Sequence, residues 1–280
     1  MAGVRIVTDS SCDLSAEEAA ALDIEIVPLT IRFGADEYTD GQDLSVERFY
    51  ELMAASDALP ETAAPSPGSF EAAFRRQADA GADAVVCINI SAELSATMQS
   101  AQNAARALEG ELDVRVIDSR SITMGLGTQV LLAARAAADG SSVDEVTELV
   151  GSLRRRTRVM GVLDTLENLK KGGRIGGAQA LLGSMLSIKP CIDISSGKVE
   201  EASKQRTRKK SLQWLRDQAL GQGRPEHLSI VHAQAGDVDD MVALLTPTVP
   251  RDEIRVGLIG PVIGTHTGRG TVGACFLVPE

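Results

Sequence analysis

The chain has few residues of the kinds that build metal centres and disulfide frameworks. Histidine occurs three times in 280 residues, and aromatic residues make up 3% of the chain. The four cysteines are Cys12, Cys87, Cys191 and Cys275, and no two of them form a C-x-x-C pair. Their spacing matches neither a zinc site nor a dense disulfide framework, so we expect no metal site. The apolar runs around Cys87 and Cys275 favour buried thiols.

Long apolar runs and an excess of positive charge are also absent. The first residues, MAGVRIVTDSS, lack the apolar core of a secretory signal, and no run approaches the roughly 18 apolar residues of a membrane span. The formal net charge is −11, from 28 basic and 39 acidic residues. General binding to nucleic acid or to a membrane surface needs a basic face. We therefore expect a cytoplasmic protein with no integral membrane segment and no nucleic-acid partner.

Several common catalytic motifs are missing. GRGTVG (268–273) matches G-x-G-x-x-G, but only seven residues follow Gly273 and they are typical of a strand. A dinucleotide fingerprint must instead open a helix, so this match is rejected. The chain has neither a Walker A sequence nor a G-x-S-x-G elbow, which argues against a nucleoside triphosphatase and an α/β-hydrolase.

Strands alternate with helices over the first half of the chain. Short β-branched or apolar runs at 4–8, 83–90 and 114–119 predict strands, and the second is typical of a buried parallel strand. With helices between them, such as 125–140, these strands form repeated units that give a parallel sheet covered on both faces. We expect an α/β protein whose N-terminal domain, residues 1–150, has three layers around a mostly parallel sheet.

Proline marks two boundaries within this half. IEIVPLTIRF (24–33) predicts one extended segment with an edge or a bend at Pro28. ETAAPSPGSF (61–70) predicts a loop, in which Ser66 before Pro67 marks the start of the next helix.

The second half mixes hairpins with helices. IKPCIDISSGKVEEAS (188–203) predicts a hairpin, and further strands are expected at 254–260 and 272–278. This mixture predicts a second α/β domain, residues 151–280, built on a mixed sheet.

Hydroxyl side chains gather where strands end and helices begin. Ser91 and Ser95 follow the strand at 83–90, and Thr62 lies in the loop before it. In an open parallel sheet, ligands bind outside the carboxyl ends of the strands, where first-turn N–H groups favour an anion. Ser91 or Ser95, together with Thr62, is therefore a candidate anion site. The alternative is that these hydroxyls only cap helices.

Arg174 follows a glycine pair in LKKGGRI (169–175). Gly172 or Gly173 is expected to end a helix, so Arg174 projects from a fixed turn. A guanidinium in such a place suits a carboxylate or a phosphate. An ordinary surface arginine is the alternative.

His266 lies in a run that is nearly all small residues, GPVIGTHTGRG (260–270). It stands between Thr265 and Thr267, and we expect this run to be a strand end followed by a rigid glycine loop. Glycines let a backbone approach another group closely. Because a histidine without a bulky shield can form hydrogen bonds near neutral pH, it suits an acyl or phosphoryl group.

Together these segments resemble the DegV family of fatty-acid-binding proteins, which partner a bacterial fatty-acid kinase. VTDSSCDL, TAAPSPGSF, ISAELSATMQSA, VIDS, LDTLENLKKGGRI, SIKPCI and GPVIGTHTGRG occur in the family's order. The resemblance spans the chain and implies two α/β domains with an acyl chain buried between or within them. It implies a bound fatty acid as ligand and no other cofactor.

The resemblance also implies a division of labour. This chain would hold a long-chain fatty acid and have no catalytic residue, and the kinase would convert the carboxylate to an acyl phosphate for phospholipid metabolism. Thr62 and Ser95 match the family's carboxylate-binding hydroxyls, with Ser91 as the alternative to Ser95. Arg174 and His266 match its KGGRI arginine and THTG histidine. The full expected ligand-binding set is Thr62, Ser91, Ser95, Arg174, Thr265 and His266.

The chain departs from the family pattern at four positions. Ala63 and Ala64 replace hydrogen-bonding residues of the family's TSQPS loop, and Ala96 replaces a glycine. Arg269 replaces the proline of THTGPG, which alters the surface expected to meet the partner.

Two other functions fit the same residues. One is a Ser–His–acid acyl hydrolase that uses Ser95, His266 and either Asp9 or Asp118, against which the missing nucleophile elbow counts. The other is a binding module for a carboxylate that is not a lipid.

Overall fold

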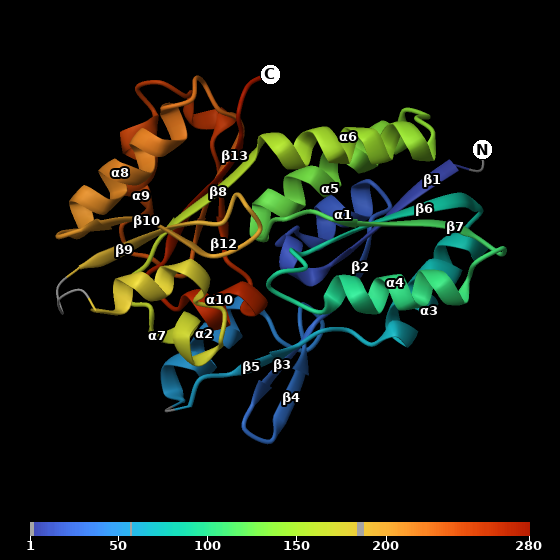
Figure 1. Ribbon diagram of the computed structural model, residues 1–280, viewed down its shortest axis with the longest axis horizontal. Coiled ribbons are helices and arrows are strands. Elements are labelled where there is room, and N and C mark those ends of the chain that lie inside the picture. The colour runs from blue at the N-terminus through green and yellow to red at the C-terminus, as the bar shows by residue number, and fades with distance from the viewer. Residues whose placement is uncertain (1–2, 57, 184–187) are drawn as a thin grey trace.

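The computed structural model describes residues 3–56, 58–183 and 188–280, and two large sheets organise it (Figure 1). The first sheet is parallel throughout. Its strands, in spatial order, are β2 (Glu25–Val27), β1 (Gly3–Asp9), β6 (Ala82–Asn89) and β7 (Asp113–Asp118). β6 lies in the middle and is almost wholly buried, as its continuous apolar run predicts.

Helices cover both faces of the first sheet. One face carries α3 (Pro67–Asp79) and α4 (Thr97–Ala107), and the other carries α5 (Thr123–Ala138) and α6 (Val143–Arg156). The short helix α1 (Ala16–Ala21) follows the 3-10 turn η1 (Ser10–Cys12). Three layers around a parallel sheet were expected from the alternating pattern, and this part of the fold prediction is confirmed.

The second sheet is mixed. Its strands, in spatial order, are β10 (Glu200–Gln205), β9 (Lys189–Asp193), β8 (Thr157–Val162), β13 (Val272–Leu277), β11 (Glu226–His232) and β12 (Arg255–Leu258). Only β11 and β12 run parallel to each other. β9 and β10 form the antiparallel hairpin predicted at 188–203. One face is covered by α8 (Arg208–Leu220) and α9 (Val238–Leu245), and η3 (Arg251–Glu253) precedes β12.

Helix α5 lies between the two sheets and contacts strands of both. Two glycines in its first turns allow the close approach. A Cβ on Gly125 would overlap the side chain of Val159 in β8, and a Cβ on Gly127 would lie 2.5 Å from the carbonyl oxygen of Cys12. As a result, α5 is buried over most of its first three turns.

A small third sheet and three short helices surround the junction of the two large sheets. The small sheet has the order β4 (Asp36–Thr39), β3 (Thr30–Phe33), β5 (Glu61–Ala63). The helices are α2 (Val46–Ala55), α7 (Glu167–Lys171) and α10 (Pro261–Thr267), and α7 leads into the 3-10 segment η2 (Gly176–Gly183).

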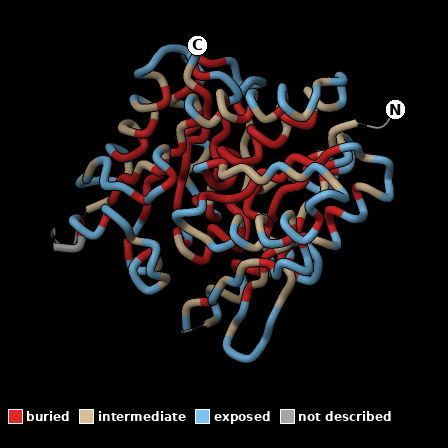
Figure 2. Tube along the Cα trace, turned by 45° about the vertical axis from the view of Figure 1, so that its right-hand side comes forward, coloured by how far each residue is buried: buried red, intermediate tan, exposed pale blue. Residues whose placement is uncertain are grey.

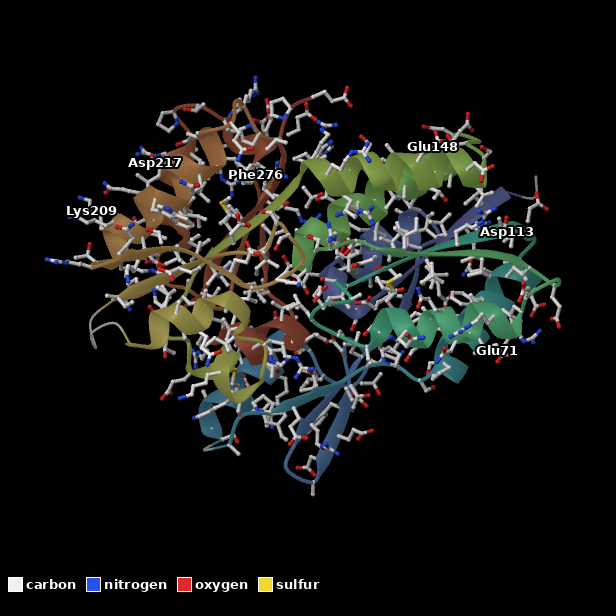
Figure 3. The ribbon with its side chains drawn as sticks, in the orientation of Figure 1. Glu71, Asp113, Glu148, Lys209, Asp217 and Phe276 are labelled. Atoms are coloured by element: carbon white, nitrogen blue, oxygen red, sulfur yellow. The ribbon has the colours of Figure 1, made fainter. Side chains whose placement is uncertain are left out.

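One hydrophobic core is shared by the two large sheets. The same cluster contains Ile6 and Val86 of the first sheet and Val159 and Val231 of the second. Figure 2 shows the buried chain running through the middle of the molecule, and Figure 3 shows charged side chains such as Glu148 projecting at its edge. We propose that the chain forms two domains, residues 1–150 and 151–280. Helix α6 runs across residue 150, and the chain enters the second sheet at β8.

Three local expectations need correction. The segment 24–33 is two strands of different sheets, β2 and β3, because the chain bends at Pro28. Part of the loop expected at 61–70 is the strand β5, which pairs with β3. The loop expected at 260–270 is largely the helix α10. It starts with Pro261 in its first turn, where the missing N–H of proline costs nothing.

Candidate functional site

A cavity of about 130 Å³ lies where the small sheet, the β6–α4 turn, α7, the β9–β10 hairpin and α10 meet. Most of its wall is aliphatic. The aliphatic lining residues larger than alanine are Leu29, Ile90, Leu94, Ile122, Leu169, Ile192, Ile194, Val199, Val262 and Ile263. The remaining lining includes Ala64 and Ala96, two of the positions at which the sequence departs from its family pattern.

Four polar side chains of the cavity wall come from four different elements. Thr62 belongs to β5, Ser95 to the turn before α4, Arg174 to the turn after α7, and His266 to α10. The structure therefore brings together four of the six residues that the sequence predicted. A fifth polar residue, Thr267, also lines the cavity and was not among them.

Thr62 and His266 form the central pair of this polar group. The Oγ1 of Thr62 lies 3.0 Å from the Nε2 of His266. Burial, together with a smaller effect of the positive charge of Arg174, lowers the pKa of His266 to about 4. The imidazole is therefore neutral at neutral pH. Its buried Nδ1 has no hydrogen-bond partner among the described residues.

Helix α7 and the turn after it hold His266 in place. Asn168 donates from Nδ2 to the carbonyl oxygen of Thr265 at 3.1 Å, which joins α7 to the last turn of α10. Gly172 lies directly against the imidazole: a Cβ there would overlap Nδ1 and would lie 3.0 Å from Cε1. A glycine at this position is what leaves room for the ring.

Arg174 connects the α7 turn to the turn that carries Ser95. Its Nη1 donates to the carbonyl oxygen of Gly172 at 2.7 Å, and its Nε donates to the carbonyl oxygen of Leu94 at 3.3 Å. Because the residue is exposed, Arg174 stands at the mouth of the cavity. Ser95 is half-buried, and its hydroxyl lies 2.8 Å from the Oγ1 of Thr97.

Ser91 and Thr265 lie beside the cavity and do not line it. The Oγ of Ser91 donates to the carbonyl oxygen of Gly197 at 2.6 Å, and the Oγ1 of Thr265 donates to that of Pro261 at 2.9 Å. Both hydroxyls are thus used within the protein. Of the two serines left open as candidates, the structure places Ser95 in the cavity wall, and a ligand-binding role for any of these residues stays a prediction.

The arrangement does not form a Ser–His–acid triad in the part of the chain that the structure describes. His266 pairs with Thr62, and the hydroxyl of Ser95 pairs with Thr97. Asp9 is buried beside Ser11 and Asn89, and Asp118 accepts from the backbone N–H groups of Ala92 and Arg120. Neither carboxylate orients the imidazole.

Over residues 3–56, 58–183 and 188–280, no group of three or more His, Cys, Asp or Glu side chains is placed to hold a metal ion. The described helices include none with the length and apolar character that crossing a membrane requires.

Nothing in the sequence indicated that Asn168 and Gly172 position His266. Asn168 acts through α10, whereas Gly172 lies directly against the imidazole. The helical state of α10 was itself missed. The signal was present in Gly260 and Pro261, which suit an N-cap and a first helical turn.

Comparison with known proteins gives a consistent set of relatives. Residues 3–278 match a family described as "Uncharacterised protein, DegV family". A DegV domain-containing protein of Listeria monocytogenes is 34% identical over 273 residues, which cover 96% of this chain and 97% of the relative. A solved structure described as fatty acid binding of a DegV family protein from Thermus thermophilus has a TM-score of 0.90 and 32% sequence identity to this chain. The match covers 99% of this chain and 100% of the other. A stearic-acid-binding protein from Eubacterium ventriosum has a TM-score of 0.87 at 27% identity, covering 98% of both chains.

Proposed function

This chain belongs to the DegV family, and on that premise we propose that it binds a long-chain fatty acid in the cavity described above. The observation that carries the proposal is the composition of the wall, which is aliphatic apart from one group of polar side chains around the Thr62–His266 pair. A molecule with a long apolar tail and one polar head matches both parts. The fatty acids bound by the structural relatives support the same ligand class.

The tail supplies most of the affinity in this proposal. Each buried methylene contributes about 0.8 kcal/mol, so a chain of palmitate length gains on the order of 10 kcal/mol before the costs of binding. The carboxylate must still receive hydrogen bonds, because a buried charge without partners is strongly unfavourable. Polar groups at one end of the cavity therefore determine which way round the ligand lies.

A neutral His266 can fill this role. If Nε2 carries the proton, it donates to the Oγ1 of Thr62, and the threonine hydroxyl is then free to donate its own proton to the carboxylate. Ser95 offers a second hydroxyl, and Arg174 offers a guanidinium at the mouth. The glycines around His266 allow close packing within the protein, since a Cβ on Gly264 would meet Tyr50 and one on Gly268 would meet Asn168.

We further propose that the bound acid is presented to a fatty-acid kinase in the cytoplasm. A carboxylate oxygen would attack the γ-phosphorus of ATP, the bond to the bridging oxygen would break, and ADP would leave with an acyl phosphate as product. Hydroxyl donors suit this step because they hold the carboxylate and leave it ionised. The absence of a triad through His266 favours a carrier over the hydrolase alternative.

The test compares a free acid with its methyl ester. Thr62→Val removes the proposed donor without changing the side chain's shape, and we expect it to weaken binding of palmitate by roughly 10-fold or more. Binding of methyl palmitate should change little. Thr267→Val is the matched control, because Thr267 lines the same cavity but its hydroxyl donates to the carbonyl oxygen of Ile263.

Native mass spectrometry and lipid extraction of the freshly purified parent complete the test. We expect a stoichiometric long-chain fatty acid. If no fatty acid is retained or taken up, and a small polar carboxylate binds instead, the proposed ligand class is wrong. Equal losses for acid and ester in Thr62→Val would remove Thr62 from carboxylate binding.

A further inference from the structure

A second, smaller space lies next to the cavity, on its inner side. It has a volume of about 20 Å³ and shares part of its wall with the first cavity, including Ile122, Ile192 and Ile263. It lies against the face of the second sheet that is turned toward α5 and α10. We refer to it as the inner pocket.

The floor of the inner pocket contains two glycines side by side. Gly161 of β8 pairs with Gly273 of β13, and the row continues to Ile192 of β9 on one side and Val231 of β11 on the other. Residues in one row of a sheet point to the same face. Between Ile192 and Val231, therefore, no side chain covers the backbone on this face of the sheet.

Hydrogen bonding makes the inner pocket apolar although three threonines line it. The hydroxyl of Thr123 lies 3.2 Å from the Sγ of Cys275. Thr267 and Thr271 donate to the carbonyl oxygens of Ile263 and Thr267, respectively. Their hydroxyls are occupied, so no polar group of these residues needs a ligand partner there.

The volume of the first cavity is too small to hold a whole long acyl chain. A volume of 130 Å³ accommodates roughly ten water-sized groups, and a methylene is about as large as a water molecule. With the carboxylate at the Thr62–His266 pair, the last carbons of a longer chain need further apolar space. The inner pocket shares wall residues with the cavity, and its volume of about 20 Å³ corresponds to roughly two more such groups.

We infer that the Gly161–Gly273 pair determines the longest acyl chain this protein accepts, by leaving the sheet bare under the last carbons. This inference rests on the proposed fatty-acid binding. A Cβ on Gly161 would meet Ile192 and Leu163 at 3.6–3.9 Å, which is ordinary packing distance. A Cβ on Gly273 would meet Val231 at 3.0 Å and the carbonyl oxygen of Met160 at 3.2 Å. Gly161 is therefore the position where a side chain can fill the pocket without disturbing the sheet.

The experiment measures binding of saturated fatty acids from about 12 to 18 carbons to the parent, Gly161→Ala and Gly161→Val. We expect Gly161→Val to weaken binding of the longest acid that the parent binds, on the order of 10-fold relative to an acid two carbons shorter, because the added methyl groups take the place of about two methylenes. Gly161→Ala should shift the preference in the same direction by less. Gly257→Ala is the control: Gly257 lies in β12 of the same sheet, with no atom within 4 Å of the added Cβ, and should leave the preference unchanged.

The outcomes separate this inference from the proposal beneath it. If the parent binds none of the acids, the proposed function fails. If the parent binds them but Gly161→Ala and Gly161→Val, with melting temperatures near that of the parent, keep its length preference, the assignment of the glycine pair is overturned. Should Gly161→Val not fold, the preference of Gly161→Ala decides between the same two results.

Discussion

His266 and Arg174 line the same cavity but differ in exposure to solvent: His266 is largely buried and Arg174 is exposed. The histidine is held against Gly172 and paired with Thr62, and burial keeps its pKa far below the usual value. The arginine is exposed, and among the described residues it donates to the backbone carbonyl oxygens of Leu94 and Gly172. Its charge therefore remains available at the cavity mouth. Neither residue supplies the apolar area on which retention of a tail depends.

We accordingly expect His266→Ala and Arg174→Ala to separate binding from phosphorylation. Both variants should retain fatty acid, with a loss in binding of no more than about 10-fold. Acyl-phosphate formation should fall by about 100-fold, because transfer requires a precise position of the carboxylate and small displacements are costly. The measurement is phosphorylation by a bacterial fatty-acid kinase with ATP, alongside lipid retention on the same samples. Phosphorylation at the parent rate would contradict the proposed roles, and complete loss of fatty acid would assign both residues to binding or folding.

Helix α10 is the element on which the site depends, and it owes its position to its neighbours. Its sequence, PVIGTHT, combines one glycine with four β-branched residues and has a low intrinsic preference for the helix. Packing compensates: a Cβ on Gly264 would lie 2.7 Å from the hydroxyl of Tyr50, so α2 can approach closely. At the other end, Asn168 of α7 donates to the carbonyl oxygen of Thr265. The helix is therefore fixed from two sides, and with it His266.

This packing predicts that Gly172→Ala disturbs the site without touching the ligand. The new methyl group must displace the imidazole, which breaks the 3.0 Å contact between His266 and Thr62. We expect the preference for a free acid over its methyl ester to fall roughly 10-fold, the worth of one hydrogen bond to a charged acceptor. Gly177→Ala is the matched control, since the nearest atom to its added Cβ is 3.6 Å away. An unchanged preference in Gly172→Ala would mean that the orientation of His266 is unimportant for binding.

Over the whole molecule, the acidic residues are not all at the surface. Asp40 is 7% exposed and lies in a cleft between α1, α2 and the start of α10. The pKa of Asp40 is raised to about 6, mainly by burial and in smaller part by the negative charge of Asp9. Hydrogen bonds from Ser10 and Gly41 act in the opposite direction. In the folded protein, Asp40 thus keeps its proton at pH values where the unfolded chain has lost it. Its contribution to stability is greatest below the unfolded pKa of 3.8 and is lost as pH rises through about 6.

Asp40→Asn should remove this pH dependence. The difference in free energy of unfolding, variant minus parent, should become more positive by up to about 3 kcal/mol as the pH rises from 4 to 7. A shift of one pKa unit corresponds to about 1.4 kcal/mol, and the pKa of Asp40 is raised from 3.8 to about 6. Urea unfolding at both pH values measures the difference. Asp36→Asn, at an exposed carboxylate in β4, is the control and should follow the parent. A constant difference between Asp40→Asn and the parent across this range would show that Asp40 does not titrate there.

Much of the fold could be predicted because its signals are local. The serine and proline at 66 and 67 cap α3 as expected, and the apolar run at 83–90 is the buried strand β6. The hairpin at 188–203 was predicted from its own residues as well. For α10 the local signals are mixed: Gly260 and Pro261 suit a helix start, but the low helix preference of the residues after them is overcome only by packing against α2 and α7, which are distant in the sequence.

The order of motifs along the chain was enough to identify the family, and the resemblance supplied the candidate polar residues. Which of those residues face one cavity was decided by packing: Thr62 and His266 are 204 residues apart and meet only through the folding of β5 against α10. Ser91 and Thr265 have the same chemical groups, yet their hydroxyls bond to backbone carbonyl oxygens outside the cavity wall. Residue type and local spacing limit what a side chain can do. Its partners are determined by contacts between distant segments, and no short stretch of sequence contains that information.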